Sequence, residues 1–307
     1  MNILQASVII PTYNGNDKLM MLLQSLEKQT CTAFEVLVVI DGSTDNTLQK
    51  IESVSWNLNA LKLIEQTNKG RAGARNSGAQ RAQSELLIFF DDDMIVDAAC
   101  IEKHIEAHTA TINRIVMGQV IEPSKKNDPE IRKYKDFLNQ SWAGILKPYA
   151  LKNIPAHLTI LSAQNMSVSV ALFKALGGFN ETLKDIEDYD LALRAKTTNI
   201  PVYYLNTAIS VHNDFFNFKK YALRSKAYLK NRRLAASLNP GLYATDTILA
   251  HKHSRLQQLA YAVLRYPFWL TVLDSCNIFT VLLPKKLRYK LYGIIITAYA
   301  HYGRNSK

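Results

Sequence analysis

Short apolar runs alternate with amphipathic stretches along the first ninety residues, and this alternation predicts a parallel sheet covered by helices. The runs are rich in β-branched and aromatic residues, which is typical of buried strands, and they lie at 7–11, 34–40, 61–65 and 86–90. The stretches between them have helical periodicity and lie at 17–29, 43–53 and 71–82. We therefore expect an α/β fold with a Rossmann-like, mostly parallel sheet, in which ligands bind beyond the carboxyl ends of the strands.

The alternation stops at residue 122. Residues 122–155 are rich in Lys, Pro, Asn and aromatic residues, and we interpret them as a mobile insertion with a short helix. Irregular segments of this length in compact domains are commonly lids or binding loops, so we assign 122–165 to the acceptor side of a site. We expect ordered structure again over 159–170. Helices are then predicted at 171–176 and 188–197, and a strand at 202–206.

Positive charge is concentrated in the last third of the chain. The whole chain has a formal charge of +11, which on its own would suggest nucleic-acid binding. From residue 215 onwards, however, 16 Lys or Arg face only Asp246 and Asp274, whereas residues 1–214 carry 21 basic and 24 acidic groups. We therefore expect a nearly neutral functional domain, 1–214, followed by an extension that meets an anionic surface.

The extension, 215–307, combines this charge with apolar stretches. Residues 215–238 read as a basic helix, and the apolar stretches 267–284 and 291–303 flank the cluster KKLRYK. Asp274 and Asn277 interrupt the first apolar stretch and the second is short, whereas a membrane-spanning helix needs about 20 apolar residues. We expect amphipathic helices that lie on an anionic membrane, and no binding of nucleic acid.

The cysteines and the N-terminus favour the cytosol. Cys31, Cys100 and Cys276 are odd in number and lack CxxC spacing, which predicts neither a disulfide framework nor a zinc site. The first residues show no basic segment followed by a long apolar one, so we expect no export signal. The predicted location is the cytoplasm, peripheral on the cytosolic face of the membrane.

Three adjacent carboxylates follow a predicted buried strand. Asp91, Asp92 and Asp93 repel one another where screening is poor, so the sequence predicts a cation among them. Three other polar segments stand near predicted strand ends or helix starts: DGSTDNT at 41–47, NKGRAGARNSG at 68–78 and EDYD at 187–190. Each also has an ordinary structural explanation, as a turn, a solvated helix face or acidic residues at a helix N-terminus. Their joint order favours a functional site.

These segments together resemble the family-2 glycosyltransferases, which adopt the GT-A fold. The resemblance covers about residues 5–214. It rests on SVIIPTYNG at 7–15, VLVVIDGSTDNT at 36–47, NKGRAGARNSGAQRAQSE at 68–85, FFDDD at 89–93, GGFNE at 177–181 and EDYDLALR at 187–194. It implies transfer of a sugar from a nucleotide diphosphate donor to an acceptor hydroxyl, with inversion at the anomeric carbon. The C-terminal third lies outside it.

The resemblance also assigns a metal site and a catalytic base. Asp91 and Asp93 are the expected ligands of Mg²⁺ or Mn²⁺, and His212 is a less secure ligand that would favour Mn²⁺. For a single displacement, the acceptor hydroxyl needs a base, which we assign to Asp188 with Glu187 as its neighbour. Asp190 would point about 200° away from Asp188 on a helix and is a poorer choice.

Donor binding is assigned by the same resemblance to Thr12, Tyr13, Asp41, Arg75 and Asp92. Asp41 would accept a hydrogen bond from a uracil imide, which favours a UDP-sugar donor. The acceptor is expected to be a glycan or a lipid-linked molecule. Two alternatives stay open: a sugar nucleotidyltransferase, although PTYNGND lacks its basic triphosphate loop, and a non-catalytic membrane-bound nucleotide-binding scaffold.

Overall fold

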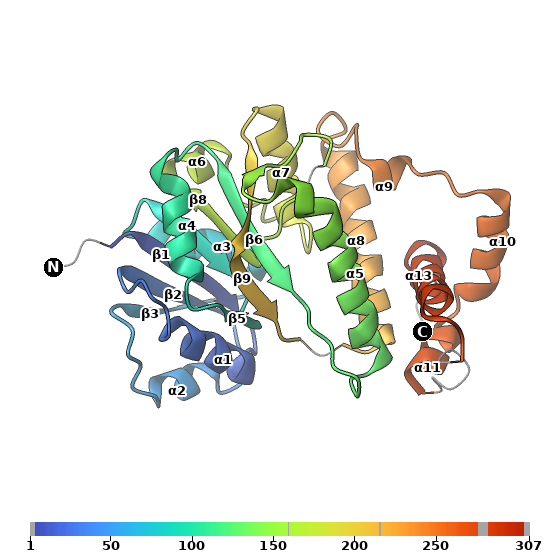
Figure 1. Ribbon diagram of the computed structural model, residues 1–307, viewed down its shortest axis with the longest axis horizontal. Helices are drawn as coiled ribbons and strands as arrows, with labels where there is room; N and C mark the ends of the chain where they lie inside the picture. The colour runs from blue at the N-terminus through green and yellow to red at the C-terminus, as the bar shows by residue number, and fades with distance from the viewer. Residues whose placement is uncertain (1–3, 159, 215, 276–281, 304–307) are drawn as a thin grey trace. The chain divides into compact units, whose positions relative to one another are not determined.

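The computed structural model describes residues 4–158, 160–214, 216–275 and 282–303. The chain divides into two compact units (Figure 1). The first contains residues 1–122 and 139–214, and the second contains residues 123–138 and 215–307. One boundary between the units lies at 214/215, and residues 123–138 group with the C-terminal extension. The assignment of 1–214 and 215–307 to separate functions stays a prediction.

The first unit is built on a nine-stranded sheet. Its strands are β1 Ala6–Thr12, β2 Phe34–Asp41, β3 Leu61–Gln66, β4 Leu86–Phe90, β5 Met94–Val96, β6 Ile115–Ile121, β7 Lys152–Asn153, β8 Asn165–Ser169 and β9 Val202–His212. The order is β3-β2-β1-β4-β8-β6-β9-β5, with β7 paired to β9. Strands β1 to β4 are parallel, as expected from the βα alternation, and β8 runs antiparallel to both β4 and β6.

Helices cover both faces of this sheet, because each buries one apolar stripe. The helices of the unit include α1 Asn16–Leu26, α2 Thr47–Glu52, α3 Gly70–Arg81, α4 Cys100–Thr109, α6 Val170–Ala175 and α7 Glu187–Thr197. Helices α1, α2 and α4 contribute to one apolar cluster. Helices α3, α6 and α7 contribute to the other. This is the expected α/β sheet flanked by helices.

Sequence periodicity located the parallel half of the fold better than the rest. The predicted strand 86–90 has the same bounds in the structure, and the other early strands agree within one residue at each end. We did not predict β5, β6 or α4. The segment 122–155 contains a 17-residue helix, α5 Glu130–Leu146, followed by the 3-10 helix η1 Lys147–Tyr149, where we expected only a short helix.

The second unit is helical. Its elements are α8 Phe218–Leu238, α9 Thr247–Ala250, α10 Arg255–Leu264, α11 Pro267–Ser275 and α13 Lys285–Tyr302, together with the first half of α5. Its core gathers aromatic and aliphatic side chains from α5, α8, α11 and α13, including Tyr134, Phe218 and Tyr292. Phe215, residues 276–281 of the expected apolar stretch and Cys276 lie outside the described residues.

None of the described helices is both long enough and apolar enough to cross a bilayer.

Candidate active site

The carboxyl ends of the strands bring the candidate residues to one edge of the sheet. Thr12 ends β1, Asp41 ends β2 and Asp91 directly follows β4, and these three strands are parallel neighbours. Strands β6 and β9 are parallel to each other, and β9 ends at His212. Met94, the residue after Asp93, pairs with His212 across β5 and β9, so the aspartates and the histidine share this edge.

Asp41 organises the loop that follows β3. Its Oδ1 accepts hydrogen bonds from Gln66 Nε2 at 2.7 Å and from the backbone N–H of Lys69 at 2.8 Å. Its backbone carbonyl accepts one from Asn68 Nδ2 at 2.9 Å. Gly42 allows this approach, because its φ is +73° and a Cβ there would lie 2.9 Å from the Asn68 nitrogen. The uracil-binding role of Asp41 stays a prediction.

Thr12 and Asp92 form a pair beside the N-terminus of α1. The Thr12 hydroxyl donates to Asp92 Oδ2 at 2.6 Å. Burial raises the pKa of Asp92 to about 7, and repulsion from Asp93 and Asp91 adds to it, which outweighs the lowering by Thr12. Gly15 makes room for the pair, since a Cβ there would meet Thr12 Oγ1 at 2.1 Å and Asp92 Oδ2 at 2.2 Å. Tyr13, at the same edge, is 53% exposed.

Arg75 joins the aspartate run to α7. Its guanidinium lies 2.6 Å from Glu187 Oε1, also pairs with Asp91, and is 5.4 Å from the ring centre of Phe179. Burial alone would lower the pKa of Arg75, but Asp91 and Glu187 raise it above its ordinary value. The structure thus places Arg75 and Asp91, expected at the donor and at the metal, against each other in an ion pair in which Arg75 is buried and Asp91 is partly exposed.

Asp188 is held at the start of α7 beside this network. Its Oδ1 accepts from the N–H of Tyr189 at 2.7 Å, and its Oδ2 lies 3.5 Å from the N–H of Ala163. Burial raises the pKa of Asp188, the negative charge of Glu187 raises it further, and Arg75 opposes the shift. A carboxylate with a raised pKa is a better proton acceptor near neutral pH. Asp190 instead pairs with Arg194 at 2.8 Å.

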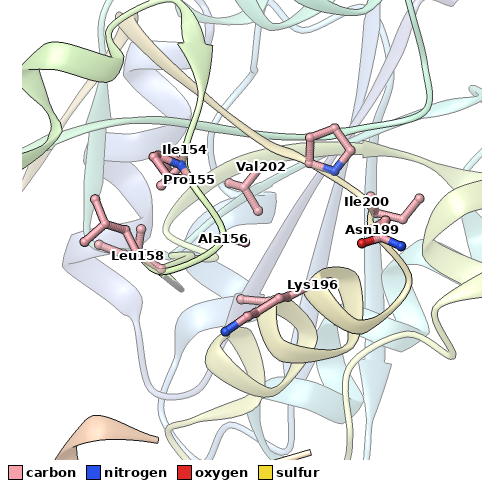
Figure 2. A pocket seen from close by; sticks show the side chains of 11 residues that line it. Ile154, Pro155, Ala156, Leu158, Lys196, Asn199, Ile200 and Val202 are labelled. Atoms are coloured by element: carbon pink, nitrogen blue, oxygen red, sulfur yellow. The ribbon is translucent and has the colours of Figure 1, made fainter. Parts of the chain in front are cut away.

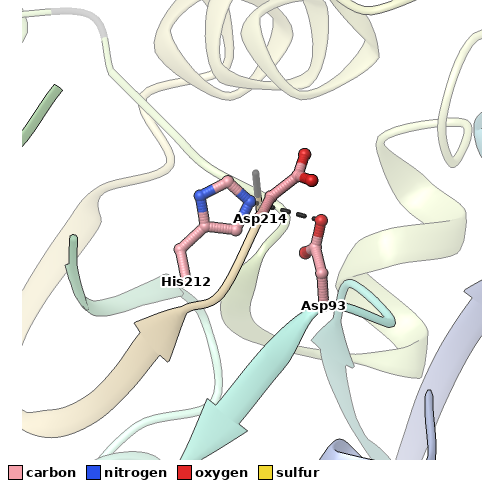
Figure 3. Close-up of side chains that lie close together, drawn as sticks. All are labelled: Asp93, His212 and Asp214. Carbon is pink, nitrogen blue, oxygen red and sulfur yellow. Dashed lines mark ion pairs between the residues drawn. The ribbon is translucent and has the colours of Figure 1, made fainter. Parts of the chain in front are cut away.

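Asp93, His212 and Asp214 form a cluster with the donor chemistry of a metal site (Figure 3). One ligand atom from each residue lies within 4.8 Å of the others. His212 Nε2 lies 3.3 Å from Asp93 Oδ2 without the geometry of a hydrogen bond, and Asp93 Oδ1 is buried with no hydrogen-bond partner among the described residues. Opposite ligands of Mg²⁺ lie roughly 4.2 Å apart, so this cluster fits a cation with small side-chain movements.

Glu122 orients the histidine of this cluster and was missed by the sequence analysis. Its Oε1 lies 3.0 Å from His212 Nδ1, on the opposite side of the ring from Asp93. Burial would lower the pKa of His212, but Asp93 and Glu122 raise it to about 9. A cation at Nε2 would displace the proton there, and the carboxylate would keep the remaining ring proton on Nδ1. The only available signal was the position of Glu122 directly after an apolar run.

Asp214 and Lys18 were also not selected from the sequence. Lys18 Nζ lies 3.0 Å from Asp214 and 3.7 Å from Asp93, so its charge balances the same carboxylates that would bind a cation. Burial would lower the pKa of Lys18, but Asp214 and Asp93 raise it above its ordinary value. VHND at 211–214 carried both His212 and Asp214, whereas nothing local to Lys18 pointed to the site.

Replacing Lys18 by Met should strengthen binding of Mn²⁺ by roughly three- to tenfold, because unit charges about 4 Å apart interact with about 1 kcal/mol in water. Electron paramagnetic resonance titration of free Mn²⁺ measures this. Lys50→Met is the matched control, since Lys50 pairs with the exposed Asp17 instead. Equal or weaker Mn²⁺ binding by the Lys18 variant would show that its ammonium does not compete for these carboxylates.

A hollow of about 210 Å³ lies further along α7 (Figure 2). Ala192 and Lys196 follow Asp188 at intervals of four residues, so the three lie on one face of the helix, and the last two line the hollow. Its other walls come from Ile154, Pro155, Ala156, Leu158, Ile160, Asn199, Ile200, Pro201 and Val202. Residues 154–160 belong to the region expected on the acceptor side.

The chain matches a known family model and known relatives. The family model described as "Glycosyl transferase family 2" matches residues 7–177, which is more than half of the chain. The uncharacterized glycosyltransferase YfnE of Bacillus subtilis is 39% identical over 116 residues, or 38% of this chain. That match spans only 30% of YfnE.

Two solved glycosyltransferases share the fold. A mannosyltransferase from Pyrobaculum calidifontis, in complex with GDP-Man and Mn²⁺, has a TM-score of 0.62 at 19% identity, over 96% of this chain and 85% of that one. Staphylococcus aureus TarS 1-349, in complex with UDP-GlcNAc, has a TM-score of 0.53 at 22% identity, over 96% and 89%. The family model covers more than half of the chain and the solved structures share its GT-A fold, so the chain belongs to the family-2 glycosyltransferases.

Proposed function

We propose that this enzyme moves a sugar from a UDP-sugar to a hydroxyl of a glycan or lipid-linked acceptor, with inversion and with the help of Mn²⁺ or Mg²⁺. One observation carries the proposal: the Asp93–His212–Asp214 cluster and Asp188 stand at the same sheet edge, with Arg75 between the aspartate run and α7. Sugar transfer needs a site for the diphosphate and a base for the acceptor hydroxyl. The cluster is the proposed diphosphate site, and Asp188 is the proposed base.

In this mechanism, Asp93, His212 and Asp214 would hold the cation, which would supply Lewis-acid stabilisation of the diphosphate leaving group. Glu122 keeps His212 oriented, and Thr12, Tyr13, Asp41 and Asp92 line the nucleotide side. Asp188 accepts the proton of the acceptor hydroxyl as it attacks the anomeric carbon from the face opposite the leaving group, which inverts that centre. Arg75 holds Glu187 and Asp91, and so sets the position of the adjacent Asp188.

Support for the donor class comes from the two similar structures: the mannosyltransferase is in complex with GDP-Man, and TarS 1-349 is in complex with UDP-GlcNAc. UDP is favoured here because Asp41 stands where the family resemblance places an acceptor for a uracil imide. The hollow beside α7 supports an acceptor side that extends from Asp188 towards residues 154–160. Its walls are mainly apolar, with Lys196 as a cation.

The partner proposed for the second unit is an anionic membrane surface on the cytosolic side. Residues 215–307 carry 16 basic side chains against Asp246 and Asp274. Anionic lipid attracts such segments, with about 1 kcal/mol for each Lys or Arg near the surface. A lipid-linked or cell-surface glycan precursor would be reached from there.

Calorimetric titration of UDP with and without Mn²⁺ tests the donor site. The wild type should bind UDP at least about tenfold more tightly with Mn²⁺, and Asp93→Ala should lose that increase, because the mutation removes a charged ligand. Asp97→Ala is the control, since Asp97 is an exposed aspartate beyond β5 whose Oδ1 accepts from the backbone N–H of Ala99 at 3.1 Å, away from the proposed cation. Failure of the wild type to bind UDP, GDP or dTDP under either condition would contradict the proposed function.

A further inference from the structure

Helix α10 presents an apolar face that stays exposed among the described residues of the second unit. Leu256, Leu259 and Val263 are 80%, 67% and 60% exposed. They are spaced by three and four residues, so they lie within about 60° of one another around the helix axis. An isolated exposed leucine needs no explanation, but three in one stripe mark a contact surface.

The opposite face of α10 already has its partner. Tyr261 is 6% exposed, and its ring centre lies 5.0 Å from that of His253 and 5.9 Å from that of Tyr302 at the end of α13. A capping box formed by Ser254 and Gln257 fixes the start of the helix. The exposed stripe is therefore held outward by packing on its other side, and is not the loose face of an unattached helix.

The exposed apolar surface continues past the end of α10. Phe268, at the start of α11, is 64% exposed, and Tyr266 between the helices is 49% exposed. The Trp269 indole donates to the backbone carbonyl of Val263 at 3.0 Å, which ties the start of α11 to α10. We call Leu256, Leu259, Val263, Tyr266 and Phe268 the α10 face.

Charge identifies the occupant of this face. Both acidic groups after residue 214 are engaged within the unit: Asp246 pairs with Arg232 and caps α9, and Asp274 accepts from the N–H groups of Phe218 and Lys219. The sequence around the α10 face carries Lys252, Arg255 and Arg265 without a single acidic residue between 247 and 273. A surface that binds another protein would be expected to carry both acidic and basic side chains around its apolar residues. Apolar side chains flanked only by basic residues match an anionic bilayer.

We propose that the α10 face is the membrane-inserting element of this protein, and that it binds the surface of a bilayer containing anionic phospholipid. The leucines and the valine enter the boundary between headgroups and acyl chains, while the flanking cations remain at the phosphates. This inference deepens the proposed membrane partner and does not depend on sugar transfer.

Vesicle flotation of the full-length protein tests it. The wild type should float with vesicles of phosphatidylcholine and phosphatidylglycerol and far less with phosphatidylcholine alone. The triple variant Leu256→Gln, Leu259→Gln and Val263→Gln should bind the mixed vesicles on the order of tenfold more weakly or less, because it loses most of the inserting area. These substitutions should leave the fold intact, because the three positions are exposed and Gln is a good helix former.

Leu234→Gln with Leu238→Gln is the matched control, because these leucines are 44% and 63% exposed on α8 of the same unit. The control should float like the wild type. Equal flotation of the triple variant and the wild type would overturn the proposal. The α10 face would instead be a dimer interface if the wild type were a dimer and the triple variant a monomer that floats equally well. UDP titration of the triple variant separates the two proposals, since nucleotide binding should be unchanged whether or not flotation is lost.

Discussion

Replacing Asp188 by Asn is expected to lower the rate of sugar transfer by about a hundredfold to ten-thousandfold, the usual contribution of a general base. Asn has nearly the same shape, and its Oδ1 can still accept from the N–H of Tyr189. Its Nδ2 cannot accept from the N–H of Ala163, and the amide cannot take a proton. UDP binding should be unaffected, because Asp188 lies on α7 and is not among the residues assigned to the nucleotide. Release of UDP from a UDP-sugar, measured beside calorimetric UDP binding, separates the two effects.

Asp190→Asn is the control for this variant. Asp190 is an aspartate on the same helix, pairs with Arg194 and faces away from Asp188. Its substitution should leave turnover within a few-fold of wild type. Full turnover by the Asp188 variant, or an equal loss in both variants, would place the base elsewhere.

The pH dependence of turnover gives a second readout for Asp188. Burial and Glu187 raise the pKa of this carboxyl, and only the deprotonated form is a base. Turnover in the wild type should therefore fall as the pH is lowered through a pKa above the ordinary aspartate range. An acid limb at the ordinary aspartate pKa would contradict the proposed environment.

Replacing Arg75 by Met should cost about 3–5 kcal/mol of unfolding free energy, as expected when one partner of a buried ion pair is removed. The cost arises because Glu187 and Asp91 would keep their charges in a buried place without a counterion. For a unit of this size, the loss corresponds to a fall in melting temperature on the order of 10 °C. Differential scanning calorimetry measures it.

The cost should also depend on pH. Without Arg75, the penalty comes from carboxylate charge that has lost its counterion, so it is present at high pH and shrinks as protonation removes that charge at lower pH. The difference in melting temperature between wild type and variant should thus be smaller at pH 5 than at pH 8. Arg71→Met, one turn earlier on α3, is the control: Arg71 forms a partly exposed pair with Asp185, and its loss should cost 1 kcal/mol or less. Equal melting temperatures for both variants would mean that Arg75 is not the counterion described above.

Local patterns were sufficient for the parallel half of the fold. The β-branched runs and helical stretches up to residue 90 predict β1 to β4 and α1 to α3, because burial on both faces of a parallel strand leaves a signal in the run itself. The same reasoning placed Thr12, Asp41 and Asp91 at strand ends, since the last residue of each run is visible in the sequence. Strand β6 and helix α4 were missed even though their apolar residues are buried.

The sequence by itself determined the family, the alternation of strands and helices, and the set of acidic residues from which a site is built. The tertiary structure decided which partner each acidic side chain contacts. Asp91 and Asp93 are two residues apart, yet one faces Arg75 and the other faces His212. Lys18 meets Asp214 across 196 positions and Glu122 meets His212 across 90, pairings that no local pattern encodes. They depend on where β6, β9 and β5 are placed in the sheet, and that order follows from packing the whole unit.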